Sequence, residues 1–137
     1  MFSMKTRTTA GLLAAAAALS SIGSIGAAGA SAAAPAKTKL SIHTQNGDFS
    51  GAVNSKKRKC MNNREVIVFR QLGAHRNPSV DQEVASDTSS LQNGVGHWET
   101  GNTGLRDGKR YYAHTSASPG CKAATSGTVT TVLDPEF

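Results

Sequence analysis

From residue 40 onward, short runs of β-branched and aromatic residues alternate with turn residues along the chain. Within most runs, apolar and polar positions alternate with a period of two, which is typical of strands that bury one face. No segment combines a 3.6-residue apolar period with helix caps. The pattern therefore predicts an all-β domain of about seven strands, over residues 40–45, 48–55, 65–72, 80–89, 96–100, 109–116 and 123–133.

Turn residues separate the predicted strands. Asn46-Gly47 is the strongest of these signals, because both residues accept a positive φ. Leu91-Gln92-Asn93-Gly94 predicts another turn. Because short strands cannot each bury a face alone, we predict two sheets packed face to face. The expected core consists of Leu40, Ile42, Phe49, Val53, Val66, Val68, Val84, Trp98, Tyr111, Ala113 and Val129.

The segment before residue 33 differs in composition from the rest of the chain. A start that carries Lys5 and Arg7 leads into an apolar run of small residues, which ends in Ala30-Ser31-Ala32. This order is typical of a secretory signal peptide, and we predict cleavage after Ala32. A membrane anchor is the alternative, but glycines interrupt the run, so we expect no membrane span after cleavage. The predicted parts are a signal peptide over 1–32, a flexible spacer over 33–39, a β domain over 40–133 and a tail over 134–137.

Cys60 and Cys121 are the two cysteines of the chain, and both follow the predicted signal peptide. In an oxidising compartment, a single pair of cysteines most simply forms one disulfide. The closed loop of roughly sixty residues would contribute about 4 kcal/mol in the chain-entropy model, a large share of the roughly 5–15 kcal/mol expected for a domain. A zinc site lacks support, because the sequence has no CxxC spacing or His pair, and we predict no cofactor.

Several short motifs follow one another along the domain. They are Phe49-x-Gly51-x-Val53, Cys60, Arg64-x-Val66-x-Val68-Phe69-Arg70, Gly94-Val95-Gly96-His97-Trp98, Tyr111-Tyr112-Ala113 and Cys121. Over about residues 40–132 this order resembles small secreted bacterial domains of the carboxypeptidase-regulatory-like, transthyretin-like class. The resemblance implies an antiparallel seven-stranded Greek-key sandwich, transthyretin-like or immunoglobulin-like, with one disulfide. Such domains usually act as non-catalytic accessory or adhesive modules.

The enzymatic branch of that class, the hydroxyisourate hydrolases, is marked by a Tyr-Arg-Gly-Ser C-terminus. This chain ends in Asp134-Pro135-Glu136-Phe137, so the resemblance does not carry that activity over, and we predict no enzyme. The class also has polar residues where Ile67 and Phe69 stand. If Val66 and Val68 face the core, these two side chains point away from it. They then lie under a neighbouring loop, or they form an exposed patch that marks a partner surface.

Four consecutive cations precede the first cysteine: Lys56, Lys57, Arg58 and Lys59. The run resembles a nuclear-localisation signal or a heparin-binding patch, but nuclear import is incompatible with export. Its position predicts a solvated hairpin loop, with weak contact to an anionic polymer or lipid head group as the alternative. After residue 32 the chain holds thirteen of its fifteen Lys and Arg and all nine acids, a formal charge of +4. That charge is modest and no aromatic platform flanks the run, so we predict no nucleic-acid binding.

Two binding functions follow from these features. The first is a secreted, non-enzymatic β-sandwich that binds an extracellular protein or glycan. The second is a carbohydrate-binding module that stacks sugars on exposed aromatic rings, for which Trp98, Tyr111 and Tyr112 are the candidates beside the apolar pair Ile67 and Phe69. Buried core packing of Trp98 is the alternative to its role in stacking.

A metal-dependent hydrolase is a third possibility. It depends on His97 and His114 lying on neighbouring strands, with Glu99 on the same face as His97. Zinc requires three or four convergent ligands. The alternative is that these histidines are ordinary solvent-facing residues.

Overall fold

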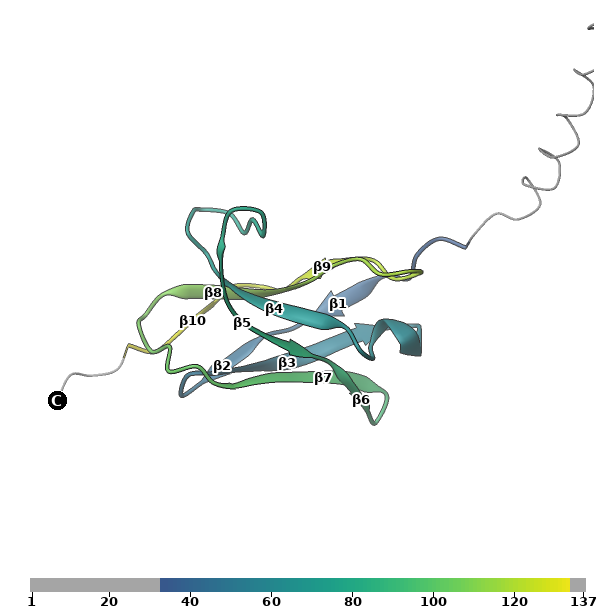
Figure 1. Cartoon of the computed structure of the whole chain (residues 1–137), viewed down its shortest axis with the longest axis horizontal. Helices are drawn as coiled ribbons and strands as arrows, with labels where there is room; N and C mark the ends of the chain where they lie inside the picture. The colour runs from purple at the N-terminus through teal and green to yellow at the C-terminus, as the bar shows by residue number, and fades with distance from the viewer. Residues whose placement is uncertain (1–32, 134–137) are drawn as a thin grey trace, which may run out of the picture. The chain divides into compact units, whose positions relative to one another are not determined.

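The computed structural model describes residues 33–133, which form a sandwich of two antiparallel sheets (Figure 1). The predicted signal peptide and tail lie outside the described residues. The first sheet has the order β1 (Thr38–Leu40), β3 (Asp48–Ser55), β7 (Val95–Asn102) and β6 (Ser90–Gln92), with β2 (His43–Gln45) also paired to β3. The second has the order β10 (Val129–Thr130), β8 (Arg110–Thr115), β4 (Glu65–Arg70) and β5 (Gln82–Thr88), with β9 (Ala124–Thr125) also paired to β8. The all-β prediction is therefore confirmed.

The chain crosses between the two sheets after β3, after β5 and after β7. If β1 and β2 are treated as one interrupted strand, and β9 and β10 as another, the sheets follow the immunoglobulin orders A-B-E-D and C′-C-F-G. Within residues 33–133 the helical structure assigned is a 3₁₀ turn over Arg58–Cys60. No helix in this part of the chain is long and apolar enough to cross a membrane.

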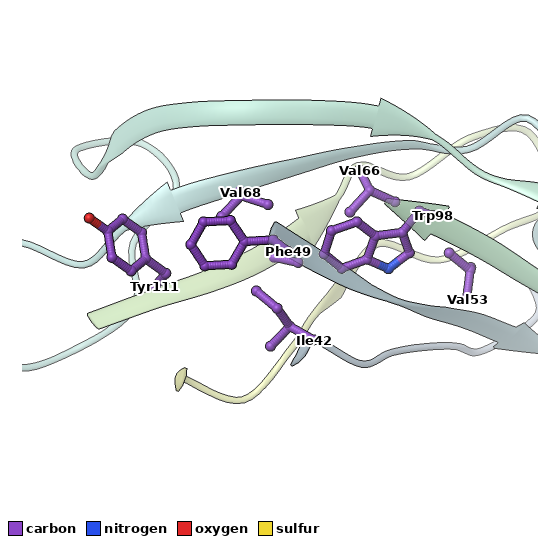
Figure 2. Close-up of a cluster of buried hydrophobic side chains, with 8 residues drawn as sticks. Ile42, Phe49, Val53, Val66, Val68, Trp98 and Tyr111 are labelled. Atoms are coloured by element: carbon purple, nitrogen blue, oxygen red, sulfur yellow. The ribbon is translucent and has the colours of Figure 1, made fainter. Parts of the chain in front are cut away.

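The core confirms the alternation of apolar and polar positions. A buried cluster joins the inner faces of both sheets (Figure 2). Phe49 and Tyr111 meet across it with ring centroids 5.1 Å apart. The cluster consists of Ile42, Phe49, Val53, Val66, Val68, Trp98, Tyr111 and Ala113, with Leu40, Val84 and Val129 packed against it. Every residue expected in the core therefore lies in it or against it.

Two predicted strands are interrupted by contacts from elsewhere in the fold. The run over 40–45 breaks at Ser41, whose N–H donates to Ala52 O while its Oγ accepts from Ala52 N. The run over 123–133 breaks at Ser126, whose Oγ accepts from Ala113 N. A side-chain hydroxyl thus takes the place of a strand carbonyl in each case.

Two further boundaries differ from the prediction. Leu91 and Gln92, expected in a turn, belong to β6, and the turn itself is Asn93-Gly94 with both φ angles positive. The segment 33–39 was expected to be a flexible spacer. However, Ala36 N donates to Gly120 O, Lys122 N donates to Ala36 O, and β1 begins at Thr38. Those backbone hydrogen bonds tie the start of the domain to the segment around the second cysteine.

Candidate functional site

The predicted disulfide between Cys60 and Cys121 is present. Both cysteines are buried, and their Cα atoms lie 5.4 Å apart. The bond joins the 3₁₀ turn after β3 to the segment that follows β8. It therefore ties together two loops at one end of the sandwich, which we call the disulfide end.

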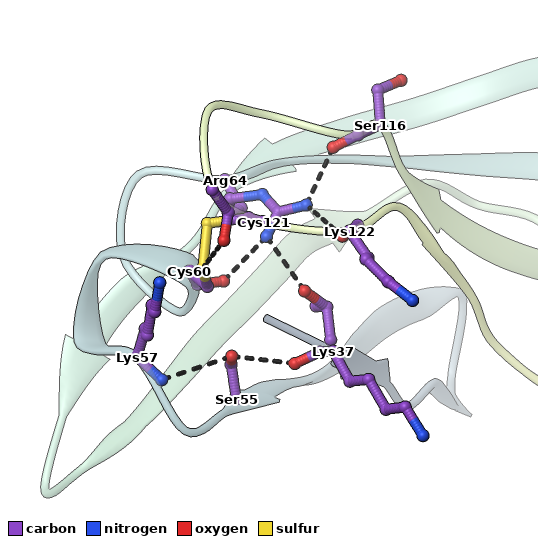
Figure 3. The surroundings of a disulfide bond; sticks show 10 residues. Lys37, Ser55, Lys57, Cys60, Arg64, Ser116, Cys121 and Lys122 are labelled. Carbon is purple, nitrogen blue, oxygen red and sulfur yellow. Dashed lines mark hydrogen bonds between the residues drawn. A yellow bond between two sulfur atoms is a disulfide. The ribbon is translucent and has the colours of Figure 1, made fainter. Parts of the chain in front are cut away.

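Arg64 is the main structural feature of this end that sequence reasoning missed. Its side chain is only 4 % exposed. Nη1 donates to Cys60 O at 2.9 Å and to Thr38 Oγ1 at 3.3 Å. Nη2 donates to Ser116 O at 2.8 Å and to Lys122 O at 3.1 Å (Figure 3). One guanidinium thus bridges three segments of the chain: β1, the 3₁₀ turn and the segment that follows β8.

The guanidinium of Arg64 is held by neutral oxygens rather than by a carboxylate in these four bonds. Burial lowers the pKa of Arg64 from its ordinary value, yet an arginine remains charged at neutral pH. A buried positive charge therefore lies directly behind the disulfide end. It has the planar, multi-donor geometry that a lysine cannot reproduce.

The cationic run is exposed over all four of its residues, Lys56, Lys57, Arg58 and Lys59. The prediction of a hairpin loop is wrong, because β3 and β4 belong to different sheets and the run crosses between them. This crossing places the run beside other cations. The carbonyl of Lys37 accepts from Ser55 Oγ and that of Lys122 accepts from Arg64 Nη2, so both lysines belong to the disulfide end (Figure 3).

A groove of about 520 Å³ lies beside the disulfide. Lys59 and Ile67, which the sequence singled out for different reasons, both line it. Its acidic residue is the exposed Glu65. The remaining lining residues are Asn62, Asn63, Arg64, Thr115, Ser116, Ala117, Ser118, Pro119 and Cys121.

The aromatic candidates for sugar stacking are buried. Trp98 is 2 % exposed, and Tyr111 and Tyr112 are each 0 % exposed. Trp98 and Tyr111 belong to the core. Tyr112 points outward but stacks on Phe69 at 5.6 Å between ring centroids. None of these three rings therefore offers an open face to a sugar.

Ile67 and Phe69 point away from the core, as expected from the buried positions of Val66 and Val68. Phe69 is 7 % exposed, whereas Ile67 is only half-buried. The loop after β4 closes over the neighbouring ring, because Asp81 Oδ2 accepts from Tyr112 Oη at 2.6 Å and Arg76 donates to Ser126 O. Of the two expectations for Ile67 and Phe69, cover by a neighbouring loop therefore fits the structure better than an exposed apolar patch.

The proposed metal cluster is wrong. His97 and Glu99 lie on β7 and His114 on β8, and these strands belong to different sheets. All three side chains alternate with core residues, so they point outward on opposite faces of the sandwich. Among residues 33–133, no group of three His, Cys, Asp or Glu side chains is close enough to hold a metal ion.

The hydroxyls of the two consecutive tyrosines each donate a hydrogen bond to an aspartate in a loop. Tyr111 Oη donates to Asp107 Oδ2 at 2.7 Å, and Tyr112 Oη donates to Asp81. Burial and the hydrogen bond to Asp107 raise the pKa of Tyr111 to about 12. Burial and the bond to Asp81 raise the pKa of Tyr112 well above its ordinary value. Both phenols therefore stay protonated at neutral pH and donate these hydrogen bonds.

Acid should weaken the fold through these two aspartates. Burial alone would raise the pKa of Asp81 and of Asp107, but hydrogen bonds from a tyrosine and from backbone N–H groups hold both below the ordinary value. A lowered carboxyl pKa contributes stability above the unfolded-state value of about 3.9 that is lost as the pH falls through the folded-state value. We expect the free energy of unfolding to drop below about pH 4.

Urea unfolding at stepped pH measures this loss. The Asp81→Asn/Asp107→Asn variant should be less stable than the wild type at neutral pH and should lose less stability on acidification. An acid slope equal to that of the wild type would show that other groups control the acid response.

No protein-family model matches the chain, and no curated protein is significantly similar to it in sequence. The candidate site therefore rests on geometry: a groove lined by Lys59 and Arg64, a disulfide beside it, and an exposed cationic run at the same end of the sandwich.

Proposed function

We propose that this protein is an exported, non-catalytic accessory module with an immunoglobulin-type sandwich, which binds acidic polymers at the cell exterior through its disulfide end. The observation that carries the proposal is the run of exposed cations at the disulfide end, of which Lys59 lines a groove together with the buried Arg64 and the exposed Glu65. A disulfide in a domain of this size suits an oxidising compartment. The sequence before residue 33 supports export.

An acidic glycan is favoured over nucleic acid as the partner. Single-stranded nucleic acids bind to stacking platforms beside basic grooves. Trp98, Tyr111 and Tyr112 are buried, so they cannot supply such a platform. The cations are therefore suited to charged groups rather than to bases.

A lipid surface is also disfavoured. A membrane-binding face combines cations with protruding apolar side chains. The large apolar side chains that are exposed among residues 33–133 lie away from the disulfide end, near the loop after β4 and near the C-terminal end of the domain. They are Leu72, Val80, Val132 and Leu133.

Binding of dextran sulfate tests the proposal, with uncharged dextran as the control. The protein is purified in the form that the cell exports. Its affinity for each polymer is measured by calorimetry at low and at physiological ionic strength. We expect binding that weakens as salt screens the exposed charges. Lys57→Gln should weaken it more than Lys109→Gln, which removes one exposed charge at the opposite end of β8.

Three results would contradict the proposal. They are no binding at low ionic strength, equal effects of the two substitutions, and binding to single-stranded DNA that is as tight as binding to dextran sulfate.

A further inference from the structure

One lysine of the cationic run, Lys59, lines the groove beside the disulfide. A Cβ atom built on Gly120 would lie 2.6 Å from Lys59 Nζ and 3.0 Å from Lys59 Cε. The lysine side chain therefore packs over a glycine in the turn that precedes Cys121. The ammonium group of Lys59 therefore lies beside this turn, at the groove that Lys59 lines.

Arg64 adds a second positive charge behind the same groove. Because it is buried and bonded to neutral oxygens, its field reaches the groove with less screening than that of a surface cation. Glu65 lines the groove as well and opposes an anion, but it is exposed to solvent. The groove is thus favourable to one compact negative charge.

The lining of the groove combines apolar and polar surfaces. Ile67, Ala117 and Pro119 are apolar, whereas Asn62, Asn63, Ser116 and Ser118 carry amides and hydroxyls. The volume of about 520 Å³ falls within the range of small-molecule sites, roughly 300–1,000 Å³. The disulfide and Arg64 join the two sides, so the groove is formed before any ligand arrives.

We propose that this groove binds one acidic sugar unit, with its negative group against Lys59 and an apolar ring face against Ile67. The proposal rests on the proposed function and adds a defined subsite to it. The shared chemistry is a sugar that carries a phosphate or a carboxylate. Glucose 6-phosphate and glucuronate are the two probes that distinguish these sources, and glucose is the neutral control.

Two lysines from the same run give a matched test. Lys59→Gln and Lys56→Gln each remove one exposed charge, but only Lys59 lines the groove. Dissociation constants come from amide shifts in ¹H–¹⁵N spectra titrated with each probe. We expect Lys59→Gln to weaken binding of at least one acidic sugar about tenfold or more, and Lys56→Gln to weaken it less than about twofold.

Substitutions at two glycines test whether the position of the Lys59 charge matters, because they leave the charge itself in place. Gly120 and Gly101 both have φ +75°, so alanine carries a similar backbone cost at either site. At Gly101 the added Cβ meets nothing within 4 Å, whereas at Gly120 it displaces the ammonium of Lys59. We expect Gly120→Ala to weaken sugar binding and Gly101→Ala to leave it unchanged, with urea unfolding used to confirm that the two variants are equally stable.

The outcomes separate the subsite from the proposed function. If dextran sulfate binds while each matched pair of variants behaves alike, the subsite is wrong and the polymer-binding function stands. If inorganic phosphate binds as tightly as glucose 6-phosphate, the assignment to a sugar is wrong. If neither the polymer nor any acidic sugar binds, both proposals are wrong.

Discussion

Replacing Arg64 with methionine is expected to lower the free energy of unfolding by about 3–5 kcal/mol. Methionine fills a similar space but donates no hydrogen bond. The carbonyls of Cys60, Ser116 and Lys122 would each lose a charged donor. A buried acceptor left without a partner costs about 1–3 kcal/mol, and the segments that Arg64 joins would separate.

Two further variants isolate the cause of this effect. Arg64→Lys keeps the charge but loses the planar fork, so it should recover only a small part of the stability. Arg58→Met removes an exposed cation close by and should change stability by less than about 0.5 kcal/mol. Chemical unfolding of all three variants gives the comparison. If the free energies of unfolding of Arg64→Met and Arg58→Met differed by less than about 1 kcal/mol, Arg64 would not hold these segments together.

Removing the disulfide should have an effect of similar size. The bond closes a loop with a sequence separation of 61, for which the chain-entropy model gives about 4 kcal/mol. The Cys60→Ala/Cys121→Ala variant should therefore unfold at a much lower urea concentration than the wild type. Because the stabilisation acts mainly through the unfolded chain, we expect the sandwich itself to persist in the variant under native conditions.

Reduction of the wild type provides the matching control. Cys60 is 0 % and Cys121 2 % exposed, so a reductant should reach the bond only after the protein opens. Wild type unfolded and refolded in reductant should then match the double variant in stability. A loss below about 1 kcal/mol in the double variant would mean that the native state, rather than the covalent link, holds the two loops together.

The core was predictable because its strands alternate. In β3, Phe49 and Val53 share an inward face, and in β4 Val66 and Val68 do the same. Alternation records which face is buried, and it needs no knowledge of the partner strand. The disulfide was predictable for a different reason, since two cysteines allow a single intramolecular pairing.

The interruptions of the strands depend on distant contacts and leave no local signal. Ser41 and Ser126 look like ordinary strand residues in the sequence, yet each bonds to a neighbouring strand through its hydroxyl. Leu91 was placed in a turn because Asn93-Gly94 follows, whereas pairing of Leu91 with Gly96 extends the hairpin. Tertiary pairing thus overrides the local preference.

Arg64 could not be recognised from the sequence for a similar reason. It lies five residues after the last of four consecutive cations, and its neighbours do not distinguish a buried arginine from an exposed one. Its role arises because carbonyls of Cys60, Ser116 and Lys122 converge on one point in space. The groove likewise forms only when the crossing loop and the segment after β8 are brought together.

Mapping the bound ligand on the protein tests most directly whether the disulfide end binds acidic polymers. A short sulfated dextran oligosaccharide is titrated into ¹⁵N-labelled protein, and the amides that shift are assigned. We predict shifts at Lys59, Asn63 and Ser118, at the disulfide end. Shifts confined to Gly47 and Gly104 at the opposite end, or no shifts at all, would contradict this prediction.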